Sequence, residues 1–159
     1  MNRSFYVDRV MKSVEETDIV IASTGYISRE VYGNKDRDLN FYMMGSLGMA
    51  LAFGIGIALH VKNRVIVISG DGSCLMSLGT FPTAKRLKLS NLAHFILDNN
   101  CHESTGGQKT VSDLINFAHL CPNTIVYKCK KDPTVPPRIP LTPNEVTERF
   151  KNALLRIKK

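Results

Sequence analysis

A strand pattern that runs directly into a glycine-rich turn constrains the fold of this chain most. Residues 64–69 read RVIVIS, a short β-branched run typical of a strand buried in a parallel sheet, and they end at Gly70-Asp71-Gly72-Ser73. Helical sequence follows at residues 77–87, and a second strand pattern (AHFIL) at residues 93–97. Strand, helix and strand in this order predict an α/β fold with a mostly parallel sheet flanked by helices.

Further elements are predicted on both sides of this unit. Strands are expected at residues 18–22 and 124–129, and amphipathic helices at residues 1–16 and 145–157. A proline-rich segment, residues 133–143, excludes regular structure before the last helix. The length of 159 residues is that of one domain, so we expect a single domain over the whole chain, with the first and last helices covering the sheet.

The stretch from Phe41 to Val61 contains no Asp, Glu, Lys or Arg, and an apolar run of this length has to be weighed as a transmembrane helix. Its glycines and the polar Ser46 and His60 argue against a membrane span. Glycines lack the Cβ atom and let backbones approach closely. We therefore expect a buried, closely packed helix in a soluble protein.

The formal net charge of +7 raises the question of nucleic-acid binding. The basic residues gather towards the carboxyl end and form no stripe with interleaved aromatic residues, as single-strand binders have. The charge favours a small anionic substrate or an acidic partner chain instead. The cysteines form no CxxC pair, and residues 1–20 contain no apolar signal-peptide core, so a reducing cytoplasm is the expected location.

The tetrad Gly70-Asp71-Gly72-Ser73 is expected just past the carboxyl end of a strand, where open parallel sheets bind ligands. Glycines allow the backbone to approach a phosphate, and the N–H groups of Gly72 and Ser73 would open a helix, where an anion is favoured. Asp71 offers a hard oxygen ligand for Mg²⁺. Taken alone, the tetrad is also compatible with a plain turn.

Asn99 lies at the end of the next predicted strand, in Asp98-Asn99-Asn100. The interval between Asp71 and Asn99 suits a helix and a return strand, so both side chains should emerge at one edge of the sheet. The Asn99 carbonyl oxygen could join Asp71, a backbone carbonyl and diphosphate oxygens around one Mg²⁺.

This pairing of Gly-Asp-Gly with an Asn-containing turn resembles the thiamine diphosphate-binding motif of that enzyme superfamily. The resemblance implies that thiamine diphosphate and Mg²⁺ are the cofactors. It also implies that Asp71, Asn99 and the main-chain carbonyl of Cys101 are the magnesium ligands. Gly72 and Ser73 are implied as contacts of the diphosphate.

Two further segments resemble parts of the same superfamily. Gly45-Ser46-Leu47-Gly48 is similar to the segment that holds the aminopyrimidine, where the Gly45 carbonyl would accept from the 4′-amino group and Leu47 would lie beneath the thiazolium. Thr24 and Gly25 correspond to a loop that usually touches the diphosphate. An ordinary core leucine is the alternative interpretation of Leu47.

The segment from His102 to Gln108 (HESTGGQ) resembles phosphonopyruvate decarboxylases, with sulfopyruvate decarboxylases as nearest relatives, and the similarity extends over most of residues 18–130. It implies conversion of phosphonopyruvate to phosphonoacetaldehyde and CO₂, with sulfopyruvate as the alternative substrate. His102 is the predicted catalytic residue, as a proton donor or acceptor or a binder of the substrate anion. A solvated loop histidine is the alternative.

In this superfamily a glutamate from a separate pyrimidine-binding domain contacts N1′ of the cofactor, and 159 residues leave no room for such a domain. The resemblance therefore implies the β subunit of a split 2-oxo acid decarboxylase, whose α-type partner carries that domain and the catalytic glutamate. Neither nucleic acid nor membrane is an expected partner. The competing hypothesis is a non-catalytic, cofactor-binding partner protein.

Overall fold

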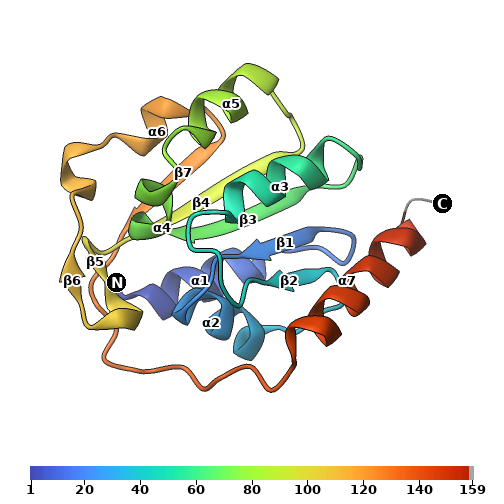
Figure 1. Cartoon of the computed structure of the whole chain (residues 1–159), viewed down its shortest axis with the longest axis horizontal. Coiled ribbons are helices and arrows are strands. Elements are labelled where there is room, and N and C mark those ends of the chain that lie inside the picture. The colour runs from blue at the N-terminus through green and yellow to red at the C-terminus, as the bar shows by residue number, and fades with distance from the viewer. Residues whose placement is uncertain (158–159) are drawn as a thin grey trace.

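Five parallel strands form the central sheet of the protein in the order β2-β1-β3-β4-β7 (Figure 1). The computed structural model describes residues 1–157. The strands are β1 (Ile19–Ala22), β2 (Asn40–Tyr42), β3 (Val65–Gly70), β4 (Leu92–Asp98) and β7 (Thr124–Lys128). A separate antiparallel pair, β5 (Cys101–His102) and β6 (Gln108–Lys109), forms a small hairpin. The predicted α/β class with a parallel sheet is confirmed.

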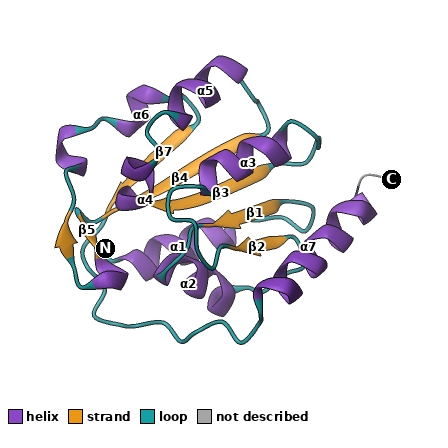
Figure 2. Cartoon of the chain, viewed as in Figure 1, coloured by secondary structure: helices purple, strands orange, loops and turns teal. Residues whose placement is uncertain are grey.

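Helices connect the strands and cover both faces of the sheet (Figure 2). They are α1 (Arg3–Lys12), α2 (Tyr26–Asn34), α3 (Ala50–Ala58), α4 (Asp71–Met76), α5 (Thr80–Leu87), α6 (Phe117–Leu120) and α7 (Pro143–Ile157). Short 3₁₀ turns lie at Glu103–Thr105 and Ser112–Leu114.

The last helix begins two residues earlier than predicted, at a proline. Thr142 and Glu145 form a capping box: the Thr142 N–H donates to Glu145 Oε2 (2.7 Å), and the Glu145 N–H donates to Thr142 Oγ1 (3.3 Å). Pro143 takes the first helical position, where its missing N–H costs no hydrogen bond. The prolines at 133–140 do lie in irregular chain, as expected.

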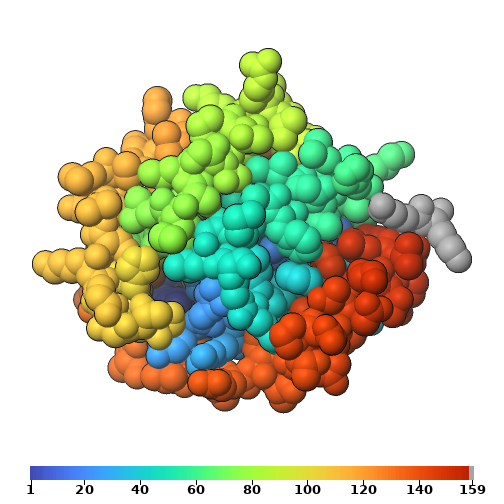
Figure 3. Space-filling view, viewed as in Figure 1, coloured from blue at the N-terminus to red at the C-terminus, as the bar shows by residue number. Residues whose placement is uncertain are grey.

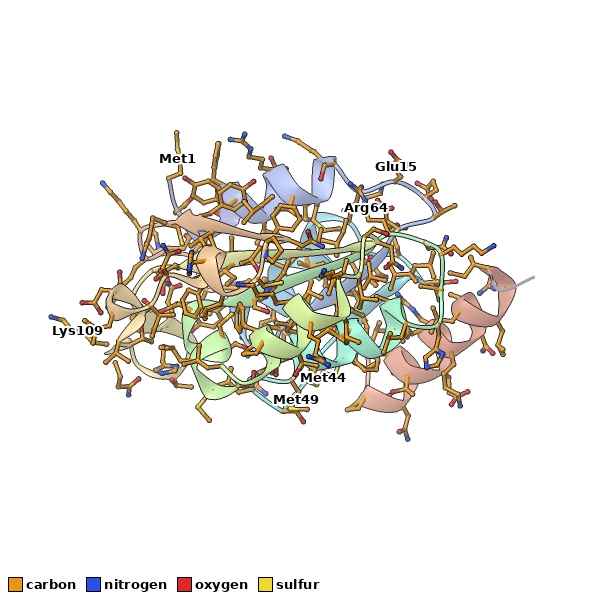
Figure 4. All side chains as sticks on the ribbon, turned by 90° about the horizontal axis from the view of Figure 1, so that it is seen from above. Met1, Glu15, Met44, Met49, Arg64 and Lys109 are labelled. Atoms are coloured by element: carbon orange, nitrogen blue, oxygen red, sulfur yellow. The ribbon has the colours of Figure 1, made fainter. Side chains whose placement is uncertain are left out.

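The core has two layers because alternate strand residues face opposite sides of the sheet. Val20 and Ile66 pack with α1 and α2, whereas Ile21 and Val67 pack with α3, α5 and α6. Seen from above, α1 lies on the side of the sheet opposite α3 and α5 (Figure 4). The helix α7 covers the β2 edge, where the ring centroids of Phe150 and Phe41 are 5.2 Å apart.

The expectation of one buried helix across residues 41–61 is wrong. The stretch contains the end of β2, an irregular loop at residues 43–49 and the nine-residue α3. The loop breaks the helix because Gly48 has a φ of +99° and Ser46 a φ of 56°. Within α3, Gly54 fits the close-packing argument, since a Cβ there would lie 2.3 Å from Val67 Cγ2, whereas Gly56 has no neighbour within 4 Å. Among residues 1–157, no helix has the length and apolar character to cross a membrane.

The strand order creates a switch point between β1 and β3. The chain leaves β1 for β2 on one side and later returns to β3 on the other, so the loops after β1 and β3 diverge. Such a crevice at the carboxyl ends of parallel strands is the usual ligand position in open α/β sheets. The tetrad that begins at Gly70 follows β3 at this point, and Gly70 pairs with Leu97 in β4.

Candidate functional site

A cavity of about 70 Å³ lies beyond the carboxyl ends of β1, β3 and β4. Figure 3 shows the surface hollowed between the hairpin near residue 105, the loop near residue 45 and N-terminal residues at its floor. Most of the predicted site residues line it: Thr24, Leu47, Asp71, Gly72, Ser73, Asn99, Cys101 and His102. Four loops that are far apart in the sequence therefore meet at one site.

Three predicted residues do not line this cavity. Gly25, with a φ of 97°, stands at the start of α2 directly after Thr24, and a Cβ there would lie 3.0 Å from Ser104 Oγ. Gly45 and Ser46 are exposed in the loop that carries Leu47. Their predicted contact with an aminopyrimidine would therefore be made at the exposed surface of the loop, outside this cavity.

Asp71 is almost fully buried, with 1% of its surface exposed. Thr110 Oγ1 donates to Asp71 Oδ2 at 2.5 Å and holds the carboxylate from the β6 side. Burial raises the pKa of the Asp71 carboxyl and the charge of Asp98 adds to the rise, whereas the hydrogen bond from Thr110 opposes it. A bound cation would therefore stabilise the charged form of this carboxylate.

Asn99 is held by hydrogen bonds on both ends of its amide group. Its Nδ2 donates to Glu103 Oε2 at 2.8 Å, and its Oδ1 accepts from the Cys101 N–H at 3.1 Å. The next residue, Asn100, has a φ of 56°, a left-handed conformation that asparagine tolerates well. This turn directs Asn99 into the cavity and starts the β5–β6 hairpin.

Arg3 is a site residue that the sequence did not indicate. It lines the cavity from the start of α1, only 3% of its surface is exposed, and its guanidinium pairs with both Glu30 and Glu103. The pair with Glu30 is bidentate, with both N–O distances at 2.9 Å. Burial raises the pKa of Glu30, and Arg3 offsets that rise only in part. No local pattern relates an arginine near the N-terminus to a loop a hundred residues later.

Ser73 joins the loops that surround the cavity. Its Oγ accepts from the Gly48 N–H at 3.1 Å and from Ser23 Oγ at 3.0 Å. Gly48 fits here because a Cβ would lie 2.9 Å from Met76 Cβ. The Ser73 side chain is thus engaged within the protein, which leaves its backbone N–H as the group that could contact a diphosphate.

His102 lies against the tetrad rather than over open solvent. A Cβ at Gly72 would come within 2.4 Å of His102 Cε1, so the imidazole covers the α-carbon of Gly72. The predicted catalytic residue thus lies next to a predicted diphosphate contact.

The donor set fits a diphosphate-bound Mg²⁺. Among residues 1–157 there is no cluster of three or more His, Cys, Asp or Glu side chains that could hold a metal alone. Mg²⁺ commonly takes only one or two protein carboxylates and completes its shell with phosphate oxygens and water. The Asp71 carboxylate and the Asn99 amide oxygen, which directly follow the neighbouring strands β3 and β4, match that requirement. Ligand pockets usually measure about 300–1,000 Å³, so this cavity could enclose only part of such a cofactor.

Comparison with known families finds a match over most of the chain. Residues 23–128 match the family model described as the thiamine pyrophosphate enzyme, C-terminal TPP binding domain. The chain belongs to the thiamine pyrophosphate enzyme family. The matched range contains every predicted cofactor and metal residue, and it leaves Arg3 and α7 outside.

Named relatives fall into two groups within this family. A phosphonopyruvate decarboxylase from Streptomyces hygroscopicus is 43% identical over 126 residues, which are 77% of this chain and 31% of that protein. The β subunit of sulfopyruvate decarboxylase from Methanocaldococcus jannaschii is 37% identical over 148 residues, 93% of this chain and 74% of the subunit. The chain thus spans about a third of the phosphonopyruvate decarboxylases that it matches and most of that β subunit.

A solved structure shares the fold. A thiamin diphosphate-dependent enzyme from Mycobacterium smegmatis superposes with a TM-score of 0.59 at 19% identity, over 77% of this chain and 25% of that one. The arrangement of sheet and helices is thus one found in thiamine diphosphate enzymes.

Proposed function

We propose that this chain is the cofactor-binding β subunit of a two-subunit, thiamine diphosphate-dependent 2-oxo acid decarboxylase. The observation that carries the proposal is the meeting of Asp71 and Asn99 in one cavity at the switch point of the sheet, within the region matched by the family. In this proposal Asp71, Asn99 and the Cys101 carbonyl hold Mg²⁺. The backbone N–H groups of Gly72 and Ser73 bind the diphosphate.

Two features support a partner subunit. Glu103 is the single glutamate among the described residues that line the cavity, and its carboxylate is engaged by Arg3, Asn99 and the Asp132 N–H. It is therefore not free to contact N1′ of a pyrimidine, and that carboxylate would come from an α-type chain. The β-subunit names of the methanogen relatives support the same assembly.

An exposed apolar patch beside the cavity supports it as well. Met44, Leu47 and Met49 in the loop after β2 are 40%, 42% and 48% exposed, and Met76 at the end of α4 is 65% exposed. Met44 and Met49 lie on the same side of the molecule (Figure 4). Large apolar side chains grouped in this way commonly mark a protein interface.

For the substrate we propose phosphonopyruvate, which would lose CO₂ to give phosphonoacetaldehyde. The support is the resemblance of residues 102–108 to phosphonopyruvate decarboxylases, two of which are 42–43% identical to this chain; identity itself does not separate the substrates, since a sulfopyruvate decarboxylase β subunit is 46% identical over 104 residues. Sulfopyruvate is the second candidate, because the relatives that match most of this chain along most of their own length are sulfopyruvate decarboxylase β subunits. Both acids carry a second anionic group, which suits a chain with a net charge of +7.

Thiamine diphosphate, when bound, supplies the electron sink that allows the bond between the 2-oxo carbon and the carboxylate to break. The protein's own groups would orient the cofactor and shield it from water. Leu47 would support the cofactor through an apolar contact, and Thr24 would contact the diphosphate. His102, which lines the cavity beside Gly72, would exchange a proton or bind the substrate's anionic group.

The test is an assay of the chain coexpressed with its α-type partner, with Mg²⁺, thiamine diphosphate and each of the two acids. We expect CO₂ and the matching aldehyde from the complex and none from either chain alone. Asp71→Ala should abolish magnesium-dependent cofactor binding. Full turnover by this chain alone would contradict the split site, and a complex whose activity survives Asp71→Ala would favour a non-catalytic binding partner.

A further inference from the structure

Glu103 is the point where three distant segments of the chain meet. Its Oε2 accepts from Arg3 at the start of α1 and from Asn99 Nδ2 (2.8 Å), and its Oε1 accepts from the Asp132 N–H (2.6 Å). The Asp132 carboxylate in turn accepts from Ser4 Oγ at 2.6 Å. The start of α1, the turn after β4 and the chain after β7 are thereby joined beside the cavity.

These contacts allow only one orientation of the Asn99 amide. A carboxylate only accepts hydrogen bonds, so the amide NH₂ must face Glu103; a backbone N–H only donates, so the amide oxygen must face Cys101. A carbonyl oxygen has two lone pairs, and the Cys101 N–H uses one of them. Near the other lies the Cys101 thiol, a weak donor whose sulfur is 3.4 Å from the oxygen and which a bound cation would displace. Without Glu103, only the bonds from Cys101 would oppose a flip of the amide.

Arg3 does not need Glu103 for its own neutralisation. Glu30 already binds it through two hydrogen bonds of 2.9 Å, and the Arg3 guanidinium also lies 5.0 Å from the centroid of the Tyr26 ring. The side chains of Arg3, Glu30 and Glu103 are only 4%, 10% and 13% exposed. Gathering a second carboxylate around one guanidinium costs desolvation and repulsion between like charges. Because this arrangement costs free energy, a functional role of Glu103 at the cofactor site explains it better than a contribution to the stability of the fold.

We propose that Glu103, held by Arg3, is a positioning residue that orients the Asn99 amide so that its oxygen faces the magnesium site. This inference rests on the proposed function. It connects the N-terminal helix, which lies outside the family match, to the cofactor site. Groups that orient a metal ligand in this way typically change metal affinity by about 10- to 100-fold when removed.

The experiment measures the Mg²⁺ concentration that gives half-maximal thiamine diphosphate binding, by calorimetry on the full chain coexpressed with its partner. Glu103→Ala should raise this concentration by about 10- to 100-fold. Glu103→Gln should raise it less, because its amide oxygen can still accept from Asn99 and keeps the side chain's shape. The Gln variant also provides the measurement if Glu103→Ala does not fold.

The matched control is Glu30→Gln, which weakens the same buried pair with Arg3 but does not touch Asn99. It should lower the melting temperature and leave the Mg²⁺ dependence close to wild type. A second arm combines Glu103→Gln with Asn99→Asp, because a carboxylate has no donor end to misorient and can accept from the new amide. The combined variant should need less Mg²⁺ than Glu103→Ala.

Equal shifts for the Glu103 and Glu30 variants, or no shift for Glu103→Ala, would overturn the positioning role while leaving the proposed function intact. A wild-type complex that binds no thiamine diphosphate at any Mg²⁺ concentration would overturn both. The two failures are therefore distinguishable.

Discussion

The imidazole of His102 covers the α-carbon of Gly72, and a Cβ at that glycine would approach Cε1 to 2.4 Å and Nδ1 to 2.5 Å. The glycine belongs to the first turn of α4 and the histidine to β5. Gly72 thus does more than expose a backbone N–H: its missing side chain makes the room that the hairpin's histidine fills. The positions of two predicted site residues depend on each other.

Gly72→Ala should therefore displace His102. Overpacking of this kind costs about 1–3 kcal/mol, and we expect a loss of that size in the free energy of unfolding, measured by urea denaturation. Adding His102→Ala should recover most of the loss because the clash is gone. If the double variant is no more stable than Gly72→Ala, the contact between these residues does not limit position 72.

Two glycines lie two residues apart in α3, and their replacement by alanine should change stability in opposite directions. A Cβ at Gly54 would meet Val67 Cγ2 at 2.3 Å in the core, whereas a Cβ at Gly56 would have no neighbour within 4 Å. Gly54→Ala should destabilise the protein by about 1–3 kcal/mol. Gly56→Ala should stabilise it by up to about 1 kcal/mol, because alanine is the better helix former. Thermal unfolding of both variants checks the sign, and equal effects would contradict the packing of α3 on β3.

Much of the fold could be predicted because its strands are continuous apolar runs and its turns carry glycine. The runs at residues 18–22, 64–69 and 93–97 each became a parallel strand within one or two residues of the expected bounds. The stretch at residues 41–61 could not be divided correctly. Absence of charge marks burial, and a buried strand, a loop and a buried helix share that composition.

For the candidate site, the sequence predicts best that residues directly after neighbouring strands lie close together. Asp71 and Asn99 do so, and the parallel register brings their strand ends together. The contacts of Arg3 and Glu103 could not be predicted, since a pair of charged residues a hundred positions apart has no periodicity and surface pairing is the default expectation for both. The helical start at Pro143 shows a subtler limit, because the same residue type both breaks helices and opens them.

Stability should fall in acid because of His94. This imidazole is 1% exposed, its Nε2 lies 3.1 Å from Ser69 Oγ, and burial lowers its pKa to about 3. In the unfolded chain the pKa is about 6.5, so between these values the unfolded state binds a proton that the folded state does not. The contribution of His94 to the free energy of unfolding is therefore fully present above about pH 6.5 and is lost progressively as the pH falls towards 3. At pH 5 the loss from this group is about 2 kcal/mol.

The measurement is the free energy of unfolding in urea between pH 4.5 and pH 7.5. His94→Gln removes the titrating group, so its stability should depend less steeply on pH than that of the wild type, whatever its value at neutral pH. The matched control, His60→Gln, changes an exposed histidine and should leave the slope unchanged. Parallel curves for wild type and His94→Gln would refute the assignment of the acid loss to His94.

The Ser73 hydroxyl should contribute to the stability of the fold. It should also affect cofactor binding, because it holds the loop that carries Leu47. Ser73→Ala leaves the buried Gly48 N–H without its acceptor and removes the partner of Ser23 Oγ. An unsatisfied buried donor costs about 1–3 kcal/mol, which urea denaturation can measure. The loop that carries Leu47 loses an attachment at the same time, so the Kd for thiamine diphosphate should rise even at saturating Mg²⁺.

Ser13→Ala is the matched control, because it removes one hydroxyl hydrogen bond, to the Val10 carbonyl, from an exposed position at the end of α1. It should lower stability only slightly and leave the Kd unchanged, and equal effects of the two variants on the Kd would rule out a role for Ser73 in holding this loop.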